Sequence, residues 1–256
     1  MASTKGVVLI TGSSQGLGRA IALRLAEDGF DVSINDLPSK TRELDALAAD
    51  IIAKGRRSCV VPGDVSVESD VISIIDNTVH ELGALNIMVA NAGVCSFRSI
   101  VDTSTEDWNR IFTVNGLGTF LCYKHAAKQM IKQGHGGRIV GASSIAGKQG
   151  YSDLAAYSAS KGAIRLFTQS AAREFGPYGI TVNAYAPGPT YTDMLTDLGK
   201  TTGDEQAFYD AQIAMSARGQ LTEPADIASI VSYLVSSEAR LITGQSISVN
   251  SGLFFD

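Results

Sequence analysis

The sequence predicts an α/β fold in which helices cover both faces of a parallel sheet of about seven strands. Short apolar runs alternate with longer helical patterns from one end of the chain to the other. The runs are continuously apolar, as in strands that are buried on both faces. A length of 256 residues is enough for one such domain with a large core. We therefore expect residues 1–256 to form a single doubly wound domain.

Each element is predicted from a local pattern. Leu17, Ile21 and Leu25 share one face of the first helix. The last helix is predicted to start near Pro224, because Thr222 supplies a capping hydroxyl and proline suits a first helical turn. The predicted strands are 7–10, 32–34, 59–61, 87–90, 138–142, 181–186 and 246–249. The predicted helices are 17–28, 41–54, 68–82, 106–133, 155–175 and 225–235.

The alternation of strands and helices breaks once, in a polar stretch that is interrupted by glycines. Insertions of this length in a compact domain are usually functional. We expect residues 190–220 to form a substrate lid whose apolar side chains, such as Met194 and Phe208, form a wall against the ligand. The alternative is that these side chains pack permanently on the core or on a neighbouring subunit.

Composition and charge exclude several classes of partner. The net charge of −5 favours neither nucleic acid nor an anionic membrane surface. No stretch approaches the roughly 20 apolar residues that span a bilayer, and the residues before the first strand lack the apolar core of a signal peptide. Cys59, Cys95 and Cys122 have no metal-binding spacing, so we expect reduced thiols and no metal site. These features predict a cytoplasmic protein.

A glycine-rich loop, residues 11–18, joins the first strand to the first helix. Glycine allows a tight turn and the close approach of backbone to a pyrophosphate, whose charge the helix N-terminus attracts. In this context the loop predicts a Rossmann-type dinucleotide site, and an ordinary glycine-rich turn is the alternative. The loop residues expected to contact the dinucleotide are Gly12, Ser14, Gln15, Gly16, Leu17 and Gly18.

Asp36 ends the second strand, at the distance from the loop where a ribose-binding carboxylate is expected. It would accept hydrogen bonds from the adenosine ribose and repel the additional phosphate of NADP. Unit charges about 4 Å apart interact by up to about 4 kcal/mol at an effective dielectric constant of about 20, which is enough to favour NAD. Lys40 and Arg42 lie nearby and weaken the preference. A local capping role for Asp36 is the alternative.

Tyr157 and Lys161 are four residues apart on a predicted helix and therefore share a face. A free tyrosine has a pKa of about 10, and a neighbouring ammonium or an oxidised nicotinamide lowers that pKa. Such a phenol can protonate an alkoxide or deprotonate an alcohol. Ser144 ends the fifth strand, at the edge where ligand clefts form in α/β sheets. A packed tyrosine beside a solvated lysine is the alternative.

Together with further motifs, these residues resemble the short-chain dehydrogenase/reductase family over essentially the whole chain. Residues 11–18 match its TGxxxGxG loop, and residues 64–65 match its adenine-contacting pair. Residues 90–93 match its NNAG motif with Ala90 as a departure, and Asn115 matches the asparagine of its catalytic tetrad. The cofactor-binding residues that this adds are Asp64, Val65, Asn91, Ala92 and Gly93.

The same resemblance assigns a role to each candidate catalytic residue. Ser144 lies 13 residues before Tyr157 and would steady the substrate oxygen, while Tyr157 exchanges the proton. Lys161 would bind the nicotinamide ribose and lower the tyrosine pKa. Asn115 would hold a water in the proton relay. The segment that would hold the nicotinamide carboxamide contains Pro187, Gly188, Thr190 and Thr192.

The family also implies the strand order 3-2-1-4-5-6-7 and a homotetramer. The segments 183–188, 192–194 and 243–246 are similar to the acetoin, diacetyl and butanediol dehydrogenase branch. This similarity predicts an NAD(H)-dependent oxidoreductase that acts on a small carbonyl compound or secondary alcohol. Residues 250–252 (Asn-Ser-Gly) depart from the Asp-Gly-Gly that is common there.

Three other functions remain open at this point. A 3-oxoacyl carrier-protein reductase would need basic residues at the cleft mouth, for which Lys124, Lys128 and Lys148 are candidates. A sugar or polyol dehydrogenase would share the same segments. A non-catalytic dinucleotide-sensing protein would be expected to lose Tyr157 or Lys161, and this chain has both.

Overall fold

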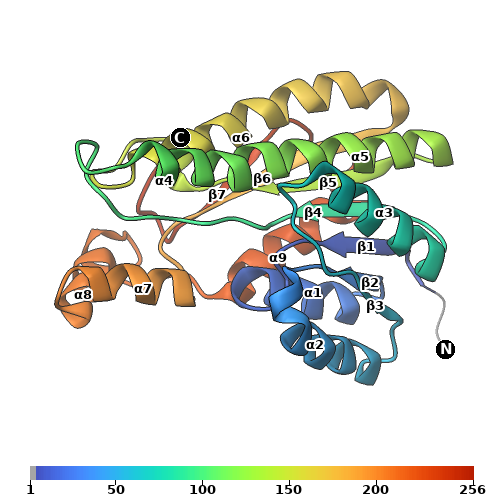
Figure 1. Cartoon of the computed structure of the whole chain (residues 1–256), viewed down its shortest axis with the longest axis horizontal. Helices are drawn as coiled ribbons and strands as arrows, with labels where there is room; N and C mark the ends of the chain where they lie inside the picture. The colour runs from blue at the N-terminus through green and yellow to red at the C-terminus, as the bar shows by residue number, and fades with distance from the viewer. Residues whose placement is uncertain (1–3) are drawn as a thin grey trace.

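The computed structural model describes residues 4–256, in which seven parallel strands form one sheet (Figure 1). The order β3-β2-β1-β4-β5-β6-β7 confirms the one that the family resemblance implies. Ile10 of β1 is level with Ile34 of β2 and with Val89 of β4, so these strands end together at one edge. The strands are β1 (Val7–Ile10), β2 (Asp31–Ile34), β3 (Ser58–Val60), β4 (Ile87–Ala90), β5 (Gly137–Ala142), β6 (Ile180–Pro187) and β7 (Ser246–Val249).

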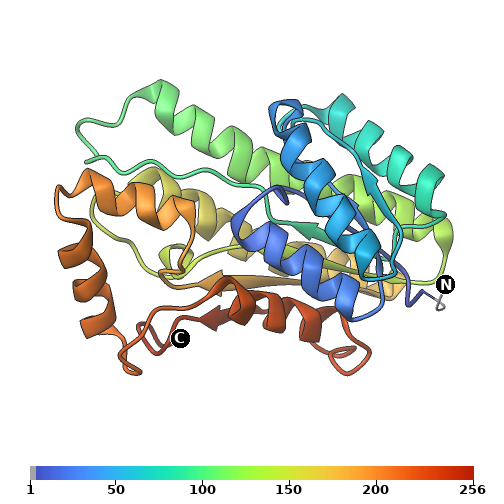
Figure 2. The same cartoon turned by 90° about the horizontal axis from the view of Figure 1, so that it is seen from below.

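Helices cover both faces of the sheet (Figures 1 and 2). They are α1 (Gly16–Glu27), α2 (Thr41–Ala53), α3 (Glu68–Leu82), α4 (Thr105–Ile111), α5 (Gly118–Gln133), α6 (Ala155–Phe175), α7 (Asp193–Thr201), α8 (Glu205–Met215) and α9 (Pro224–Val235). Val8 and Ile10 pack in one apolar cluster with α1, α2 and α9, whereas Leu9 packs in a second cluster with α3, α5 and α6. Alternate residues of β1 thus face opposite helical layers. Among residues 4–256, no helix combines the length and apolar character needed to cross a membrane.

The single helix predicted over 106–133 is divided in the structure. α4 ends at Ile111, residues Phe112–Leu117 form a π-helical segment, and α5 begins at Gly118. A π turn holds an additional residue and changes which side chains share a helix face. Asn115 lies within this segment and is completely buried. The prediction of one regular helix is therefore wrong at the position of a candidate catalytic residue.

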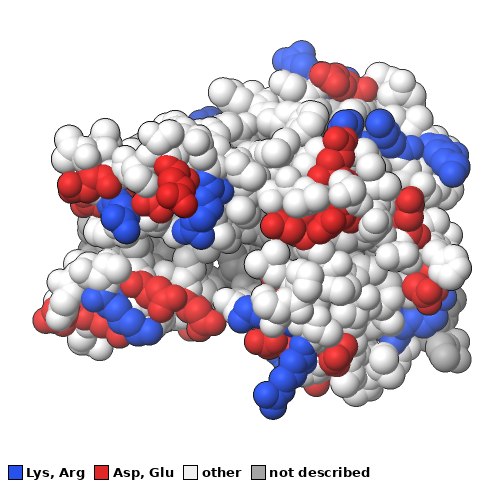
Figure 3. Space-filling model, in the orientation of Figure 1, with Lys and Arg blue, Asp and Glu red and all other residues white. Residues whose placement is uncertain are grey.

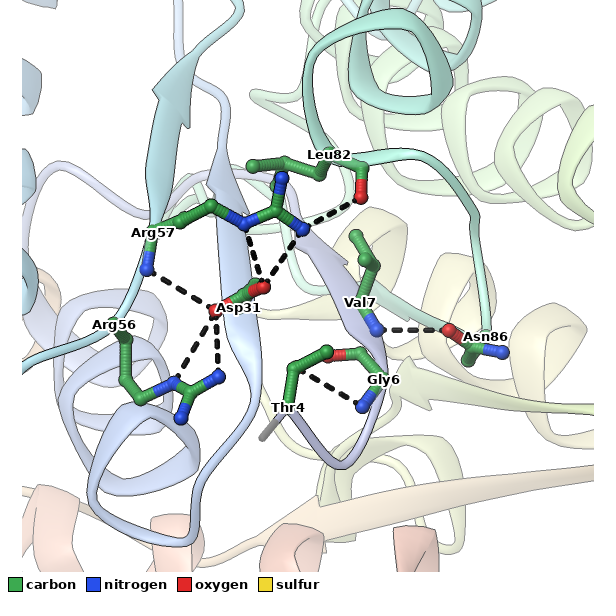
Figure 4. Close-up of polar contacts among 8 residues, drawn as sticks. All are labelled: Thr4, Gly6, Val7, Asp31, Arg56, Arg57, Leu82 and Asn86. Atoms are coloured by element: carbon green, nitrogen blue, oxygen red, sulfur yellow. Dashed lines mark hydrogen bonds and ion pairs between the residues drawn. The ribbon is translucent and has the colours of Figure 1, made fainter. Parts of the chain in front are cut away.

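A buried ion cluster surrounds Asp31 at the start of β2, and it stabilises the side of the sheet where the strands begin (Figure 4). Its carboxylate lies 2.8 Å from Nη2 of Arg56 and 2.9 Å from Nη2 of Arg57. Arg57 also donates to the carbonyl of Leu82, at 2.8 Å, so β2, the approach to β3 and the end of α3 are tied together. Burial raises the pKa of Asp31, but hydrogen bonds from Arg57 and Arg56 outweigh burial and lower it.

We expect Asp31→Asn to lower the free energy of unfolding by roughly 3 kcal/mol, because Arg56 keeps its guanidinium buried after the carboxylate charge is removed. The ordinary pKa of this aspartate is 3.8 and the folded value is lower. The carboxylate therefore stabilises the fold above about pH 3.8, and this contribution is lost as the pH falls through the folded value. Urea unfolding at several pH values measures both effects.

The matched control is Asp50→Asn, since Asp50 pairs with Arg19 at 2.6 Å while both side chains are about half exposed. Its effect should stay below about 1 kcal/mol. Equal losses in the two variants would mean that the Asp31 cluster is no more important than a surface pair.

Candidate active site

The candidate site lies at the edge where the parallel strands end. Ligands of open α/β sheets bind outside these carboxyl ends. Figure 3 shows an opening on this side, between the lobe formed by α7 and α8 and the part of the molecule that carries α4. The catalytic and cofactor residues expected from the sequence come from the loops and helices that border this edge.

The glycine loop after β1 packs against the loop after β4 without room for side chains. A Cβ on Gly12 would lie 2.8 Å from Cα of Ala92, and the φ of Gly12 is +63°. A Cβ on Gly18 would lie 2.2 Å from the carbonyl oxygen of Gly12. Only glycine fits these two positions. The N-terminus of α1, which carries no acidic residue in its first turn, therefore opens toward a space suited to a phosphate.

Asn91 was expected to bind cofactor, and its side chain instead holds the glycine loop together. Its Nδ2 group donates to the carbonyls of Thr11 and Gly12, both at 2.9 Å. Its Oδ1 atom accepts a hydrogen bond from the hydroxyl of Tyr185 at 2.7 Å. The side chain of Asn91 therefore joins the glycine loop to β6.

Tyr185 is a residue that the sequence reasoning missed. It lies in β6 and is completely buried, and its hydroxyl completes the hydrogen bonding of Asn91. The available signal was a tyrosine inside an otherwise small and apolar strand end, Ala184 to Pro187. A buried phenol needs a hydrogen-bond partner, so such a residue indicates a polar group nearby.

Asp36 is oriented by the same loop. One carboxylate oxygen accepts hydrogen bonds from the amide and the hydroxyl of Ser14, at 3.2 and 2.6 Å. The other accepts from the amide of Leu37 at 2.9 Å. Lys40, which the sequence placed nearby, pairs with Glu43 at 3.4 Å. The carboxylate thus lies beside the dinucleotide loop and is held by neutral donors rather than by a cation.

The expected adenine pair lies on the adjacent loop, after β3. Asp64 accepts hydrogen bonds from the amide and hydroxyl of Ser66, at 2.8 and 2.7 Å. Val65 is buried against Gly118 at the start of α5, where a Cβ would lie 2.9 Å from the valine. Asp64 and Val65 thus lie in the loop after β3, beside the loop that carries Asp36.

The structure brings Ser144, Tyr157 and Lys161 together. Ser144 follows β5, and its hydroxyl lies close enough to the phenol of Tyr157 to lower the pKa of that phenol. Lys161 lies one helical turn beyond Tyr157, with Nζ 5.5 Å from the centre of the tyrosine ring. Nζ also donates to the carbonyl of Ala142 at 2.8 Å. A Cβ on Gly93 would lie 3.2 Å from that ammonium, so Gly93 leaves the space that Lys161 occupies.

Burial shifts the pKa values of this pair in opposite directions. Burial lowers the pKa of Lys161 to about 8. It raises the pKa of Tyr157, and the hydrogen bond from Ser144 opposes that rise without cancelling it. In the chain by itself, burial therefore outweighs the effect that we expected the neighbouring ammonium to have on the phenol.

Asn115 holds the loop after β4 against α6. Its side chain accepts a hydrogen bond from the amide of Val94 at 2.8 Å and donates to the Val94 carbonyl at 2.9 Å. It also donates to the hydroxyl of Ser160 at 3.0 Å. All its side-chain contacts in the described chain are thus with protein groups. A role in a water relay would fall to its backbone.

Cys95 is a second residue missed by the sequence reasoning, which treated the cysteines only as reduced thiols. Its sulfur lies close enough to Tyr157 and Lys161 to shift the pKa of each. Burial raises its own pKa to about 11, so it is an uncharged thiol at neutral pH. The signal was its position two residues after Gly93. Within residues 4–256, no group of His, Cys, Asp and Glu is arranged to hold a metal ion.

The segment after β6 closes the other side of the site. The amide of Gly188 donates to the carbonyl of Val249 at 2.9 Å. This bond joins the end of β6, at Pro187, to β7. The hydroxyls of Thr190 and Thr222 lie 2.6 Å apart. The methyl group of Thr192 lies 3.7 Å from the Cβ position of Gly16. The expected carboxamide segment therefore reaches the glycine loop.

Residues 190–220 contain two helices, α7 and α8, which the sequence analysis did not predict. They pack on each other: Gly199 lies against Phe208, and the hydroxyls of Thr196 and Tyr209 are 3.0 Å apart. α8 has no buried residue, and both helices stand away from the sheet at one end of the molecule (Figures 1 and 2). Such weak attachment to the core suits a segment that moves.

Comparison with known proteins extends this description. Residues 12–254 match the family model described as Enoyl-(Acyl carrier protein) reductase. A short-chain dehydrogenase/reductase of Armillaria gallica is 51% identical, over 98% of this chain and 96% of the relative. A diacetyl reductase [(S)-acetoin forming] of Staphylococcus epidermidis is 38% identical, over 96% and 98%. A 3-oxoacyl-[acyl-carrier-protein] reductase of Staphylococcus aureus is 37% identical, over 96% and 97%.

Solved structures agree with these relatives. An NAD+-bound xylitol dehydrogenase superimposes with a TM-score of 0.92 at 30% identity, over 98% of this chain and 100% of the other. A short-chain dehydrogenase of Burkholderia cenocepacia in complex with NADP gives 0.87 at 34% identity, over 96% of both chains. Neighbours of the same fold thus bind either dinucleotide. The glycine cradle, the paired tyrosine and lysine, the sheet order and these likenesses lead to one conclusion: this chain belongs to the short-chain dehydrogenase/reductase family of oxidoreductases.

Proposed function

We propose that the protein is an NAD(H)-dependent oxidoreductase that moves a hydride between nicotinamide and a small carbonyl compound or secondary alcohol. The observation that carries this proposal is the grouping of Ser144, Tyr157 and Lys161 beside the glycine loop. The nicotinamide, held by that loop and by the segment after β6, would supply or accept the hydride. The glycine cradle around Gly12 and Gly18 fits such a group.

Each side chain then has a defined task in carbonyl reduction. Tyr157 donates the proton to the oxygen that becomes an alcohol, and its raised pKa keeps the phenol protonated at neutral pH. Ser144 donates a hydrogen bond to the same oxygen. Lys161 is a cation below about pH 8, and its charge stabilises the phenolate that remains after proton transfer. The reverse reaction uses the same groups with Tyr157 as the base.

The choice of NAD over NADP is proposed from Asp36. Its carboxylate lies where the adenosine ribose would bind and is held by Ser14 and Leu37. A ribose 2′-phosphate would meet this negative charge without a compensating cation from Lys40, which pairs with Glu43. An anion placed at this position favours the dinucleotide without the phosphate.

A small, uncharged substrate of the acetoin, diacetyl or butanediol type fits the surroundings better than a carrier-bound one. Of the lysines considered for an acidic carrier, Lys148 is buried and Lys124 pairs with Glu68 at 2.6 Å. Acidic side chains gather on the lobe beside the opening (Figure 3). Those of α7 and α8 and of the cap before α8 are Asp193, Asp197, Asp204, Glu205 and Asp210, whereas Lys200 is the only basic residue of these two helices.

Two further proposals concern assembly and motion. Residues 190–220 act as a lid that closes over the substrate, because α7 and α8 pack mainly on each other. The chain forms a homotetramer, which is the family's usual assembly. Exposed apolar side chains on and near α4 and α6 support this assembly, because another subunit would cover them. They include Ile100, Val101, Trp108 and Leu166.

Tyr157→Phe should reduce kcat by about 100-fold or more while NADH still binds, because only the proton donor is lost. Initial rates with small diketones, polyols and 3-oxoacyl thioesters, each with NADH and NADPH, measure activity and substrate class together. NADH binding is measured by fluorescence titration. The matched control is Tyr178→Phe, an exposed tyrosine beyond α6, which should retain wild-type rates. Retention of more than a few per cent of kcat in Tyr157→Phe would refute the assignment.

Asp36→Ala should narrow the ratio of kcat/KM for NADH over NADPH by about tenfold, which corresponds to about 1.4 kcal/mol. The variant loses both the contact with the ribose and the repulsion of the 2′-phosphate. The kcat/KM should therefore fall for NADH and rise for NADPH. Asp45→Ala, which removes an exposed carboxylate from α2, is the control and should leave the ratio unchanged. A wild-type preference for NADPH would contradict the proposal.

Tyr185→Phe should raise the Kd for NADH by about tenfold, because Oδ1 of Asn91 loses its donor and the glycine loop loses its support. Tyr123→Phe is the matched control: Tyr123 is also fully buried, and its hydroxyl bonds to Thr168 at 3.1 Å within the helical layer. Both variants should lose similar stability in thermal unfolding. Equal Kd values for the two variants would show that Tyr185 does not support the cofactor loop.

A further inference from the structure

Lys148 is a buried charge that the proposed reaction does not use. Its side chain is 1% exposed. The ammonium donates to the carbonyl of Ser246 at 2.6 Å, to the hydroxyl of Ser248 at 2.8 Å and to the carboxylate of Asp256. Three donors thus meet three acceptors, all from β7 and the residues that follow it. A lysine buried in this way is unavailable to an external anion.

The backbone of Lys148 ends the short turn that begins at Ser144. The hydroxyl of Ser144 accepts a hydrogen bond from the amide of Ala146 at 3.1 Å, and the amide of Gly147 donates to the Ser144 carbonyl at 2.9 Å. The amide of Lys148 donates to the carbonyl of Ile145 at 2.9 Å. Any displacement of Lys148 is therefore passed to the serine through a single helical turn.

The turn is fixed on its other side by close packing against α6. A Cβ on Gly147 would lie 2.6 Å from both the carbonyl carbon and the oxygen of Lys161, so the backbones touch there. The turn is thus held between two anchors, α6 at Gly147 and β7 at Lys148. The first anchor, at Gly147, sets the distance between the turn and α6, the helix that carries Tyr157. The second prevents it from rotating about that contact.

We propose that Lys148 is a positioning residue for Ser144, and that Asp256 is the counter-ion that makes this position stable. The carboxylate of Asp256 also accepts from the hydroxyl of Ser248 at 3.1 Å. Burial raises the pKa of Asp256, but the hydrogen bond and charge of Lys148 outweigh burial and lower it. The carboxylate of Asp256 is therefore ionised at neutral pH. Through it, residues 246–256 control the placement of a group that acts on the substrate oxygen.

This inference rests on the proposed function, because it assumes that Ser144 assists the reaction. The experiment is a double-mutant cycle of Lys148→Met and Ser144→Ala in the full chain, assayed for kcat, KM and the Kd of NADH. Lys148→Met should lower kcat by about tenfold, since small displacements of a reacting group are costly. The Kd of NADH should change by less than about twofold. In the Ser144→Ala background, Lys148→Met should cause no further loss of kcat, because coupled residues are not additive.

Two variants guard against a general loss of structure. Lys124→Met removes another lysine that is paired with a carboxylate, at 2.6 Å from Glu68, and should leave kcat unchanged. Asp256→Asn should reproduce part of the loss seen in Lys148→Met with the same dependence on Ser144, and it serves as the test if Lys148→Met does not fold.

The two proposals fail in different ways. If Ser144→Ala keeps wild-type kcat, the role of Ser144 in the proposed function is refuted, whatever Lys148 does. If Ser144→Ala is impaired and Lys148→Met is not, the positioning role of Lys148 alone is refuted. If Lys148→Met lowers kcat equally in the wild-type and the Ser144→Ala backgrounds, the positioning role is also overturned, because Lys148 would then act on a group other than Ser144.

Discussion

The side-chain amide of Asn91 joins the ends of β1, β4 and β6, and the cofactor side of the proposed site depends on that junction. Asn91 follows β4, bonds to the carbonyls after β1 and accepts the hydroxyl of Tyr185 from β6. Gly12 and Gly18 approach it closely because they lack a Cβ. The glycine loop, Asp36 and the segment after β6 therefore keep a fixed relation before any ligand binds. Such preorganisation is what chemistry at short range requires.

Several charged groups of this molecule are buried, and the effect of burial on each one depends on the groups that bond to it. Asp31 is supplied with two guanidinium groups and remains ionised at low pH. Lys148 is supplied with three acceptors. Lys161 donates to the carbonyl of Ala142, and burial lowers its pKa to about 8. The ion pairs are structural, whereas the incompletely paired lysine lies beside Tyr157, where a change of charge is useful.

The sheet order was predictable from the family resemblance, and the bounds of most strands were predictable from continuous apolar runs. The positions of Ser144, Tyr157 and Lys161 were predictable for the same reason. The π-helical segment at Asn115 was not, since hydrophobic periodicity does not register one added residue in a long helix. α7 and α8 were missed because α7 has only nine residues and α8 buries none, so neither presents a long apolar stripe to the core. The contacts of Tyr185 and Lys148 join residues far apart in sequence, which no local pattern encodes.

Thr190 and Thr222 give the segment between them a common base. Their hydroxyls bond to each other, and the amide of Tyr191 donates to the carbonyl of Thr222 at 3.1 Å. The segment therefore begins and ends at one point, between the end of β6 and the start of α9. A change in the length or sequence of residues 192–221 would leave the register of β6 and the start of α9 as they are, and closing a longer loop on a fixed base costs little entropy. If this segment is the substrate lid proposed above, the fold could exchange one substrate pocket for another without altering the glycine loop, and divergence in specificity would act on this segment.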